Sequence, residues 1–182
     1  LIDVMQKDLL QHNVLHADES PVPMLSPGKK TTHQAYIWAY ANTWPSDKPC
    51  VIYHFSPSRA GEHARAFLNG WQGQLVCDDF SGYKASFRQG VTEIGCMAHA
   101  RRKFHELHVA DKSQIAAYAL NQIAQLYALE SQAKALNDDE RRRLRQEQAV
   151  PILDELHRWL MDQRQKVPKK SATMKAIDYS LN

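Results

Sequence analysis

The chain has 182 residues, of which 43% are hydrophobic and 24% charged, and its formal net charge is +3. This length and composition predict one domain, or one domain with an insertion, that buries a substantial core. No apolar run reaches the roughly eighteen residues of a membrane-spanning helix. The pI near 8.7 is mildly basic, which permits a polyanionic partner but does not by itself indicate one.

The cysteine pattern indicates the redox environment. Cys50, Cys77 and Cys96 are few, odd in number and widely spaced, which favours reduced thiols in a cytoplasmic protein over a disulfide framework. The sequence shows no signal peptide. Because it opens on Leu1 rather than Met and stops inside an apolar helical pattern, we expect it to be part of a longer protein.

Strand-like and turn-like patterns alternate in the first third of the chain. Residues 1–11 carry apolar side chains at three- and four-residue spacing, which predicts the end of a helix. Three strand-like runs follow: Val14–Asp18, His33–Ala41 and Cys50–Phe55. The second run alternates aromatic and small apolar residues and predicts a strand covered on both faces. Pro21 marks a turn or a sheet edge, and Pro45 and Pro49 mark a loop.

The pattern then changes to alternating helices and strands. We predict a short helix over Glu62–Leu68, a strand over Gln74–Asp78, a helical turn over Gly82–Gln89 and a strand over Val91–Cys96. From Ala98 onward the helical period takes over.

Four features divide the helical part of the chain. Apolar periodicity predicts helices over 98–109 and 111–136. Asn137, with Glu140 three residues later, predicts a capping box for the next helix. Pro151 either kinks that helix or starts another one, and Ser171 can cap a last helix.

The element order β-β-β-α-β-α-β is that of the ribonuclease H-like fold. We therefore predict an α/β protein with a ribonuclease H-like mixed sheet, an all-helical insertion and a C-terminal helix. In open α/β sheets, ligands collect at the carboxyl ends of strands. Asp18 and Asp78 follow the apolar runs of the first and fourth predicted strands, where that fold carries its catalytic carboxylates.

Several segments resemble the catalytic core of bacterial transposases of the insertion-sequence-66 type. They are HADES, PVPMLSPGKKTTHQAYIWAY, FSPSRAGEHARAFLNGWQGQLVCDDFSGY and GCMAHARRKFHEL, and the resemblance runs from Asn13 to Asn182. Its most specific part is Cys96 and His99 followed by the basic residues 101–103. The family resembles the DDE transposases, in which two Asp and one Glu hold divalent metal ions, and its first Asp corresponds to Asp18.

The resemblance also implies which residue is the second carboxylate. Family members usually read Asp-Gly-Tyr-x-Gly-Tyr here, which assigns the catalytic role to Asp78 and leaves Asp79 in place of a glycine. Asp79 either perturbs metal binding or simply faces solvent. The family's Glu follows a helix resembling AIDYSLN, so we expect it beyond Asn182. Its N-terminal DNA-recognition region is expected before Leu1.

The chemistry of the residue types is consistent with this assignment. Carboxylate oxygens are the ligands that Mg²⁺ prefers, and Mn²⁺ accepts the same ligands. A pair of such ions about 4 Å apart can activate the attacking oxygen and stabilise the leaving oxygen in displacement at phosphate. We therefore predict a two-metal site at Asp18 and Asp78. For each Asp taken singly, the simpler interpretation is a cap on a turn.

The basic and histidine residues leave alternatives open. His99 is predicted either as a neighbour of the active site or as a buried, hydrogen-bonded histidine, because Cys96 and His99 supply only two of the four ligands of a structural zinc site. Arg101, Arg102 and Lys103 either contact DNA phosphates or form a solvated helix face. The basic run 141–145 follows three acids and is better explained as a solvated helix.

These observations lead to a hypothesis about domains and function. The domains are an N-terminal helix end (1–12), a catalytic core (13–109), a helical insertion (110–168) and the start of a C-terminal core helix (169–182). The protein would be a DNA transposase core that cuts and joins strands, and the chain by itself would be inactive. The alternative is a non-catalytic remnant or DNA-binding regulator of transposition.

The expected partners follow from that hypothesis. They are transposon-end and target DNA, a second copy of the chain, and accessory proteins of the same element, with no membrane. The expected location is the bacterial cytoplasm, in association with the nucleoid.

Overall fold

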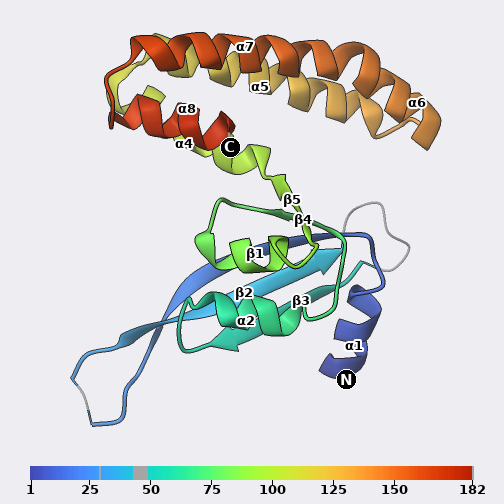
Figure 1. Cartoon of the computed structure of the whole chain (residues 1–182), viewed down its shortest axis with the longest axis vertical. Helices are drawn as coiled ribbons and strands as arrows, with labels where there is room; N and C mark the ends of the chain where they lie inside the picture. The colour runs from blue at the N-terminus through green and yellow to red at the C-terminus, as the bar shows by residue number, and fades with distance from the viewer. Residues whose placement is uncertain (29, 43–48, 182) are drawn as a thin grey trace. The chain divides into compact units, whose positions relative to one another are not determined.

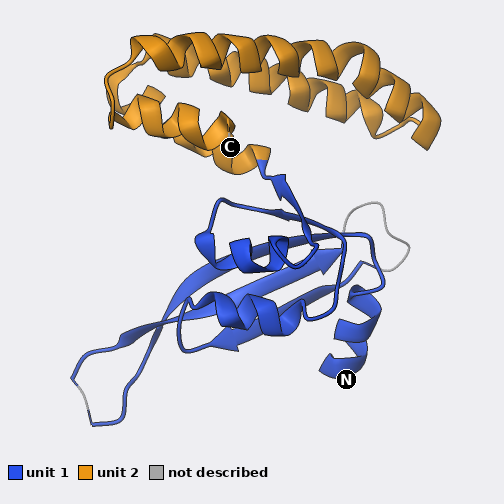
Figure 2. Cartoon of the chain, in the orientation of Figure 1, with its two compact units in different colours: residues 1–96 blue, residues 97–182 orange. Residues whose placement is uncertain are grey.

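A computed structural model describes residues 1–28, 30–42 and 49–181, which form two compact units (Figures 1 and 2). Unit 1 comprises residues 1–96 and unit 2 comprises residues 97–182. The predicted domain boundary at residue 109 therefore falls inside unit 2. Pro45, part of the predicted loop, lies outside the described residues.

Unit 1 has mixed α/β structure, and its element order agrees with the sequence prediction. Its elements are α1 (Ile2–Leu9), β1 (Val14–Met24), β2 (His33–Asn42), β3 (Val51–Ser56), α2 (Gly61–Phe67), β4 (Gln74–Cys77), the 3₁₀ turn η1 (Ser81–Tyr83), α3 (Lys84–Phe87) and β5 (Thr92–Gly95).

The strands form one mixed sheet in the order β3-β2-β1-β4-β5. β1 pairs antiparallel with β2, and β2 pairs antiparallel with β3, which makes the predicted meander. β4 returns to the other side of β1 and pairs parallel with it, and β5 pairs parallel with β4. β1 is therefore the central strand.

β1 is longer than predicted, because it continues through two prolines to Met24. The strand β4 pairs only with Val14–His16, so β2 is the described neighbour of the rest of β1. Pro21 and Pro23 are two residues apart, and both can turn the nitrogen that lacks a hydrogen toward the unpaired edge. The turn expected at Pro21 was wrong, whereas the expected edge is confirmed.

The two faces of the sheet differ in cover. Trp38 and Tyr40 are fully buried on the face that packs against α1 and α2, and the ring of Tyr40 stacks on Phe67 with a centroid distance of 3.7 Å. On the opposite face, Tyr53 and Phe55 of β3 are 70% and 52% exposed. β2 is a strand as predicted, but the full cover expected on both faces is found on one only.

Unit 2 is entirely helical in its described residues. Its elements are α4 (Met97–Asp111), α5 (Gln114–Ala133), α6 (Asp138–Leu144), the π-helical turn η2 (Arg145–Ala149), α7 (Val150–Lys166) and α8 (Ala172–Leu181). A second hydrophobic cluster, which includes Phe104, Ile123 and Leu160, joins α4, α5, α7 and α8. None of the described helices is both long and apolar enough to cross a membrane.

The helix boundaries in unit 2 follow the capping signals. The Asn137 side chain and Glu140 form the predicted capping box at the start of α6. The hydroxyl of Ser171 accepts a hydrogen bond from the backbone N–H of Met174, as expected for the cap of α8. The helical backbone runs without a break from α6 through the π-helical turn into α7, and Pro151 lies in the first turn after that segment. Pro151 therefore lies within a continuous helix whose hydrogen-bond pattern changes just before it.

Candidate active site

The pairing of β1 with β4 brings the two predicted carboxylates to neighbouring positions. Leu15 lies beside Leu75, and His16 beside Val76, in parallel register. Asp18 lies two residues after His16 in β1, and Asp78 lies two residues after Val76, just past the end of β4. Because neighbouring strands lie about 4.8 Å apart, this register would bring residues 18 and 78 to neighbouring positions beyond the end of β4. The recorded contacts of Asp78 are with Arg59 and with the backbone N–H of Phe80.

Each of the two carboxylates keeps one oxygen engaged locally. Asp18 is exposed, and its Oδ1 accepts a hydrogen bond of 3.0 Å from the backbone N–H of Glu19. The side chain of Asp78 is 25% exposed, and its Oδ1 accepts one of 3.0 Å from the N–H of Phe80. Asp78 therefore does cap a turn, which is compatible with a further role for its second oxygen.

Asp79 has a different partner from Asp78. Its Oδ1 lies 2.8 Å from Nζ of Lys84, and the same ammonium group lies 2.7 Å from Glu93 on β5. Hydrogen bonds to these two acids raise the pKa of Lys84. The charge of Asp79 is thus balanced by lysine, whereas Oδ2 of Asp78 lies 4.0 Å from Nη2 of Arg59.

A buried acid that the sequence analysis passed over stands next to Asp18. Glu19 points to the core face of β1, and its side chain is 1% exposed. Its Oε1 accepts hydrogen bonds from Nε of Arg59, at 2.8 Å, and from Nη2, while its Oε2 accepts one of 2.9 Å from the hydroxyl of Tyr83. Burial raises the pKa of Glu19, and the bonds from Arg59 and Tyr83 oppose that rise.

A sequence signal for Glu19 did exist. Leu15, Ala17 and Glu19 alternate, so a strand that continues past Asp18 places Glu19 on the core face. A buried acid requires a partner. The sequence prediction ended this strand at Asp18, so Glu19 was not expected to be buried or to need a partner.

Arg59 lies between Glu19 and Asp78 and packs against an aromatic ring. Its guanidinium carbon lies 4.0 Å from the centroid of the Phe80 ring. Phe80 meets Tyr83 edge-on at 5.8 Å, and Trp38 meets Tyr83 edge-on at 6.0 Å. Phe80 therefore lies under the guanidinium, and Trp38 and Tyr83 pack around Phe80.

Two glycines allow close packing around the Phe80 ring. A Cβ on Gly82 would lie 2.1 Å from Cε1 of Phe80, so a side chain here displaces the ring under Arg59. A Cβ on Gly61, at the start of α2, would lie 2.4 Å from the carbonyl oxygen of Gly82. The sequence places glycine at both positions of this close backbone approach.

The donor set fits a divalent cation only in part. Asp18 and Asp78 supply hard carboxylate oxygens of the kind that Mg²⁺ and Mn²⁺ bind. Within residues 1–28, 30–42 and 49–181, however, no group of three or more potential metal ligands gathers. Glu19 lies beside Asp18 in sequence, but its two oxygens accept hydrogen bonds from Arg59 and Tyr83.

The predicted residues around His99 belong to unit 2. His99 lies in the first turn of α4, and its Nδ1 is buried without a hydrogen-bond partner. Arg101 and Arg102 are exposed, whereas Nζ of Lys103 lies 4.4 Å from the ring centroid of Tyr179. The roles of His99 near the metals and of the three basic residues on DNA stay predictions.

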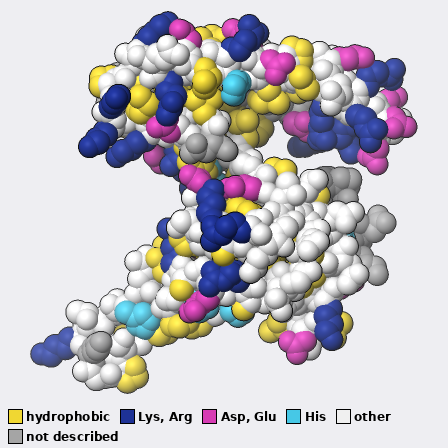
Figure 3. Space-filling model, in the orientation of Figure 1, with side chains coloured by type: hydrophobic (Ala, Val, Ile, Leu, Met, Phe, Trp, Pro, Cys, Tyr) yellow, Lys and Arg dark blue, Asp and Glu magenta, His cyan; other side chains and the backbone are white. Residues whose placement is uncertain are grey.

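The basic run at residues 141–145 is paired with acids. Arg141 bonds Asp138 at 2.9 Å, and Arg145 makes a two-pronged contact with Glu130 at 2.8 and 2.7 Å. Figure 3 shows acidic and basic side chains intermixed at the α6 end of unit 2. Arg142 and Arg143 are exposed, so the run agrees with the interpretation as a solvated helix, and two of its four arginines are ion-paired.

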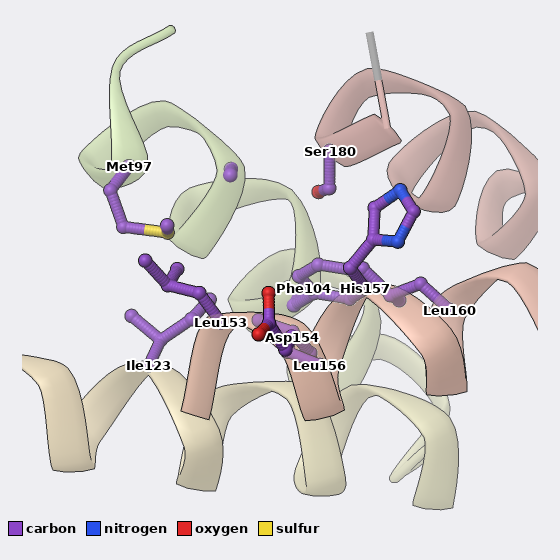
Figure 4. Close-up of a pocket in the computed structure, with 10 residues that line it drawn as sticks. Met97, Phe104, Ile123, Leu153, Asp154, Leu156, His157, Leu160 and Ser180 are labelled. Carbon is purple, nitrogen blue, oxygen red and sulfur yellow. The ribbon is translucent and has the colours of Figure 1, made fainter. Parts of the chain in front are cut away.

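Unit 2 also contains an apolar pocket, drawn in Figure 4, of about 320 Å³. Asp154, His157 and Ser180 are among its lining residues, a combination that invites comparison with a hydrolase triad. The hydroxyl of Ser180 instead donates to the carbonyl oxygen of Ala176, and in the described part of the chain no hydrogen bond joins it to His157. The recorded contact of Ser180 therefore does not form a catalytic triad with His157.

Comparison with known proteins decides the family. The whole chain, residues 1–182, matches the family described as "Transposase IS66 family". The chain belongs to the IS66 transposase family. No solved structure matches the chain.

Curated relatives of this IS66 family chain come from Sinorhizobium fredii. The uncharacterized protein y4qI is 33% identical over 193 residues, which cover all of this chain and 36% of that protein. The uncharacterized protein y4hP is 31% identical over 205 residues, with the same coverage. The chain thus spans about a third of the length of these relatives.

Proposed function

We propose that this chain is part of the catalytic core of a DNA transposase, with a ribonuclease H-like fold and a metal site at Asp18 and Asp78. The observation that supports the proposal is the parallel register of β1 and β4, in which Leu15 lies beside Leu75 and His16 beside Val76, in a member of a transposase family. Two residues further along, the same register would bring residues 18 and 78 to neighbouring positions. The element order and the strand order β3-β2-β1-β4-β5 support the fold assignment.

The reaction is metal-dependent cleavage of a DNA strand followed by transfer of its 3′ hydroxyl to target DNA. Bound Mg²⁺ or Mn²⁺ would supply activation of the attacking oxygen and stabilisation of the leaving oxygen. Asp18 and Asp78 hold the cations. If the two carboxylates converge to about 4 Å, they repel each other by about 4 kcal/mol at an effective dielectric of about 20, and a bound cation would relieve that repulsion.

The third carboxylate of the site comes from outside the chain. This part of the proposal rests on the family resemblance and agrees with the donor set of the described residues, which stops short of three ligands. Transposon-end DNA and target DNA are the substrates. A second copy of the protein and accessory proteins of the same element are proposed partners.

A second candidate function is compatible with the donor set of the described residues, which contains no group of three potential ligands. This candidate is a non-catalytic remnant or DNA-binding regulator of transposition. The two candidates differ in metal binding, because a regulator has no need of a cation at Asp18 and Asp78.

Mn²⁺ titration followed by electron paramagnetic resonance tests the proposal. We expect weak Mn²⁺ binding by the chain, which Asp18→Asn or Asp78→Asn abolishes. Asp79→Asn is the matched control, since Asp79 carries the same charge one residue away and pairs with Lys84. Mn²⁺ binding that survives both Asp18→Asn and Asp78→Asn refutes the site. So does strand transfer by the chain that is unaffected by Asp18→Ala or Asp78→Ala.

A further inference from the structure

Arg59 is held firmly by its neighbours yet remains accessible. Glu19 accepts two of its five N–H donors, and Phe80 lies under its guanidinium plane. The side chain of Arg59 is nevertheless 44% exposed, although the Glu19 carboxylate that it binds is 1% exposed.

A purely structural ion pair does not explain this arrangement. Tyr83 already donates a hydrogen bond to Glu19, and burial disfavours the charged form of that acid. Apolar residues at both positions 19 and 83 would fill the same space without a buried charge or a buried hydroxyl, as is often tolerated in protein cores. What Glu19 adds is a fixed direction for the guanidinium of Arg59.

The fixed direction leaves one edge of the guanidinium available. Nε and Nη2 form the edge that faces Glu19. The edge formed by Nη1 and Nη2 remains for a ligand, and Nη2 lies 4.0 Å from Oδ2 of Asp78. Two parallel N–H groups on such an edge match two oxygens of a phosphate.

We propose that Arg59 binds a phosphate of the DNA strand beside Asp78, and that Glu19 and Tyr83 are positioning residues that hold its guanidinium for this contact. The inference rests on the proposed function, because it supplies a substrate contact at the same site. Asp18 and Asp78 repel a phosphate diester, so a cationic group is needed at this edge in addition to any metal ion. Arg59 is the cationic side chain recorded within 4.0 Å of Asp78 in the described residues.

Salt-dependent DNA binding tests the proposal. Binding of the 182-residue chain to a fluorescein-labelled 20-base-pair duplex is measured by anisotropy over a range of salt concentrations, in Ca²⁺ to prevent cleavage. Loss of one phosphate contact reduces the slope of log K against log salt by about 0.9. We expect this change in Arg59→Gln. Arg65→Gln is the matched control, since Arg65 is an exposed arginine of α2 with the same charge, and its slope should equal that of the wild type.

Two more variants separate positioning from net charge. Arg59→Lys keeps the charge but loses the two-pronged geometry, so we expect an unchanged slope and an affinity several-fold weaker. Glu19→Gln removes a negative charge from the site, and charge alone predicts tighter DNA binding. A positioning role predicts weaker binding, and tighter binding by Glu19→Gln would overturn it.

Mn²⁺ titration of the same proteins distinguishes failure of this inference from failure of the proposed function. We expect Arg59→Gln to bind Mn²⁺ as well as the wild type, because Asp18 and Asp78 are intact. Absence of Mn²⁺ binding in the wild type counts against the proposed function. If Mn²⁺ binding is intact, two results overturn the Arg59 contact and leave the proposed function standing. One is that the wild type does not bind the duplex, and the other is that Arg59→Gln and Arg65→Gln have equal salt slopes.

Discussion

Replacement of Glu19 by leucine should destabilise unit 1, and the main cause should be the loss of a partner for Tyr83 and not for Arg59. The hydroxyl of Tyr83 is fully buried and donates to Glu19, so Glu19→Leu leaves a buried donor unpaired, at a cost of about 1–3 kcal/mol. Arg59 is 44% exposed and can turn to water, so its loss of partner adds little. We expect Glu19→Leu to lower the free energy of unfolding by about 2 kcal/mol.

A double variant isolates this cause. Tyr83→Phe removes the hydroxyl, so in that background Glu19→Leu leaves no buried hydrogen-bond donor unpaired. We therefore expect the double variant to lie within about 1 kcal/mol of Tyr83→Phe alone, because replacement of both members of a buried polar pair by apolar groups is often nearly neutral. Equal losses from Glu19→Leu in the two backgrounds would refute the reasoning.

The assay must report unit 1 separately, since two units need not unfold together. Of the four tryptophans, Trp159 lies in unit 2 and the other three lie within residues 1–96. In a Trp159→Phe parent, tryptophan fluorescence during urea denaturation reports unit 1. The midpoint should shift between variants at a constant slope.

The pH dependence of this pair has a definite sign. Burial raises the pKa of Glu19 above its ordinary value near 4.5 in the unfolded chain. The acid therefore contributes stability that is fully present below pH 4.5 and is lost as the pH rises through the higher folded value. The free energy of unfolding of the wild type, relative to Glu19→Gln, should fall between pH 4 and pH 7, and a rise would contradict the raised pKa.

Two further predictions concern a thiol and a glycine. Burial raises the pKa of Cys77 to about 12. At pH 8 a thiol reagent should therefore modify the half-buried Cys50 and Cys96 in the native protein, and Cys77 only after unfolding. Equal modification rates for the three thiols would contradict this. Gly82→Ala should lower the free energy of unfolding by about 1–3 kcal/mol, because its Cβ meets an aromatic ring at 2.1 Å. Gly95→Ala is the control, with open space around its Cβ, and an equal loss there would show that backbone freedom and not crowding is responsible.

Local signals in the sequence predicted the elements of both units well. Alternating apolar residues marked the strands, and side-chain caps such as Asn137 and Ser171 marked helix starts, because both effects act within a few residues. The end of β1 was missed for a related reason. Proline is a strong local signal against pairing, but at Pro21 the absence of a strand on one side removes the penalty, and that absence is a tertiary property.

By itself, the sequence determined the order of strands and helices, the free thiols and the candidate carboxylates Asp18 and Asp78. Only the tertiary structure decided which side chains meet. The register of β1 against β4 places Leu15 beside Leu75 and His16 beside Val76. Glu19 meets Arg59 and Tyr83, which lie 40 and 64 residues from it in sequence. Such long-range pairings depend on how the sheet is ordered and which face is buried, and neither is encoded in any short stretch of residues.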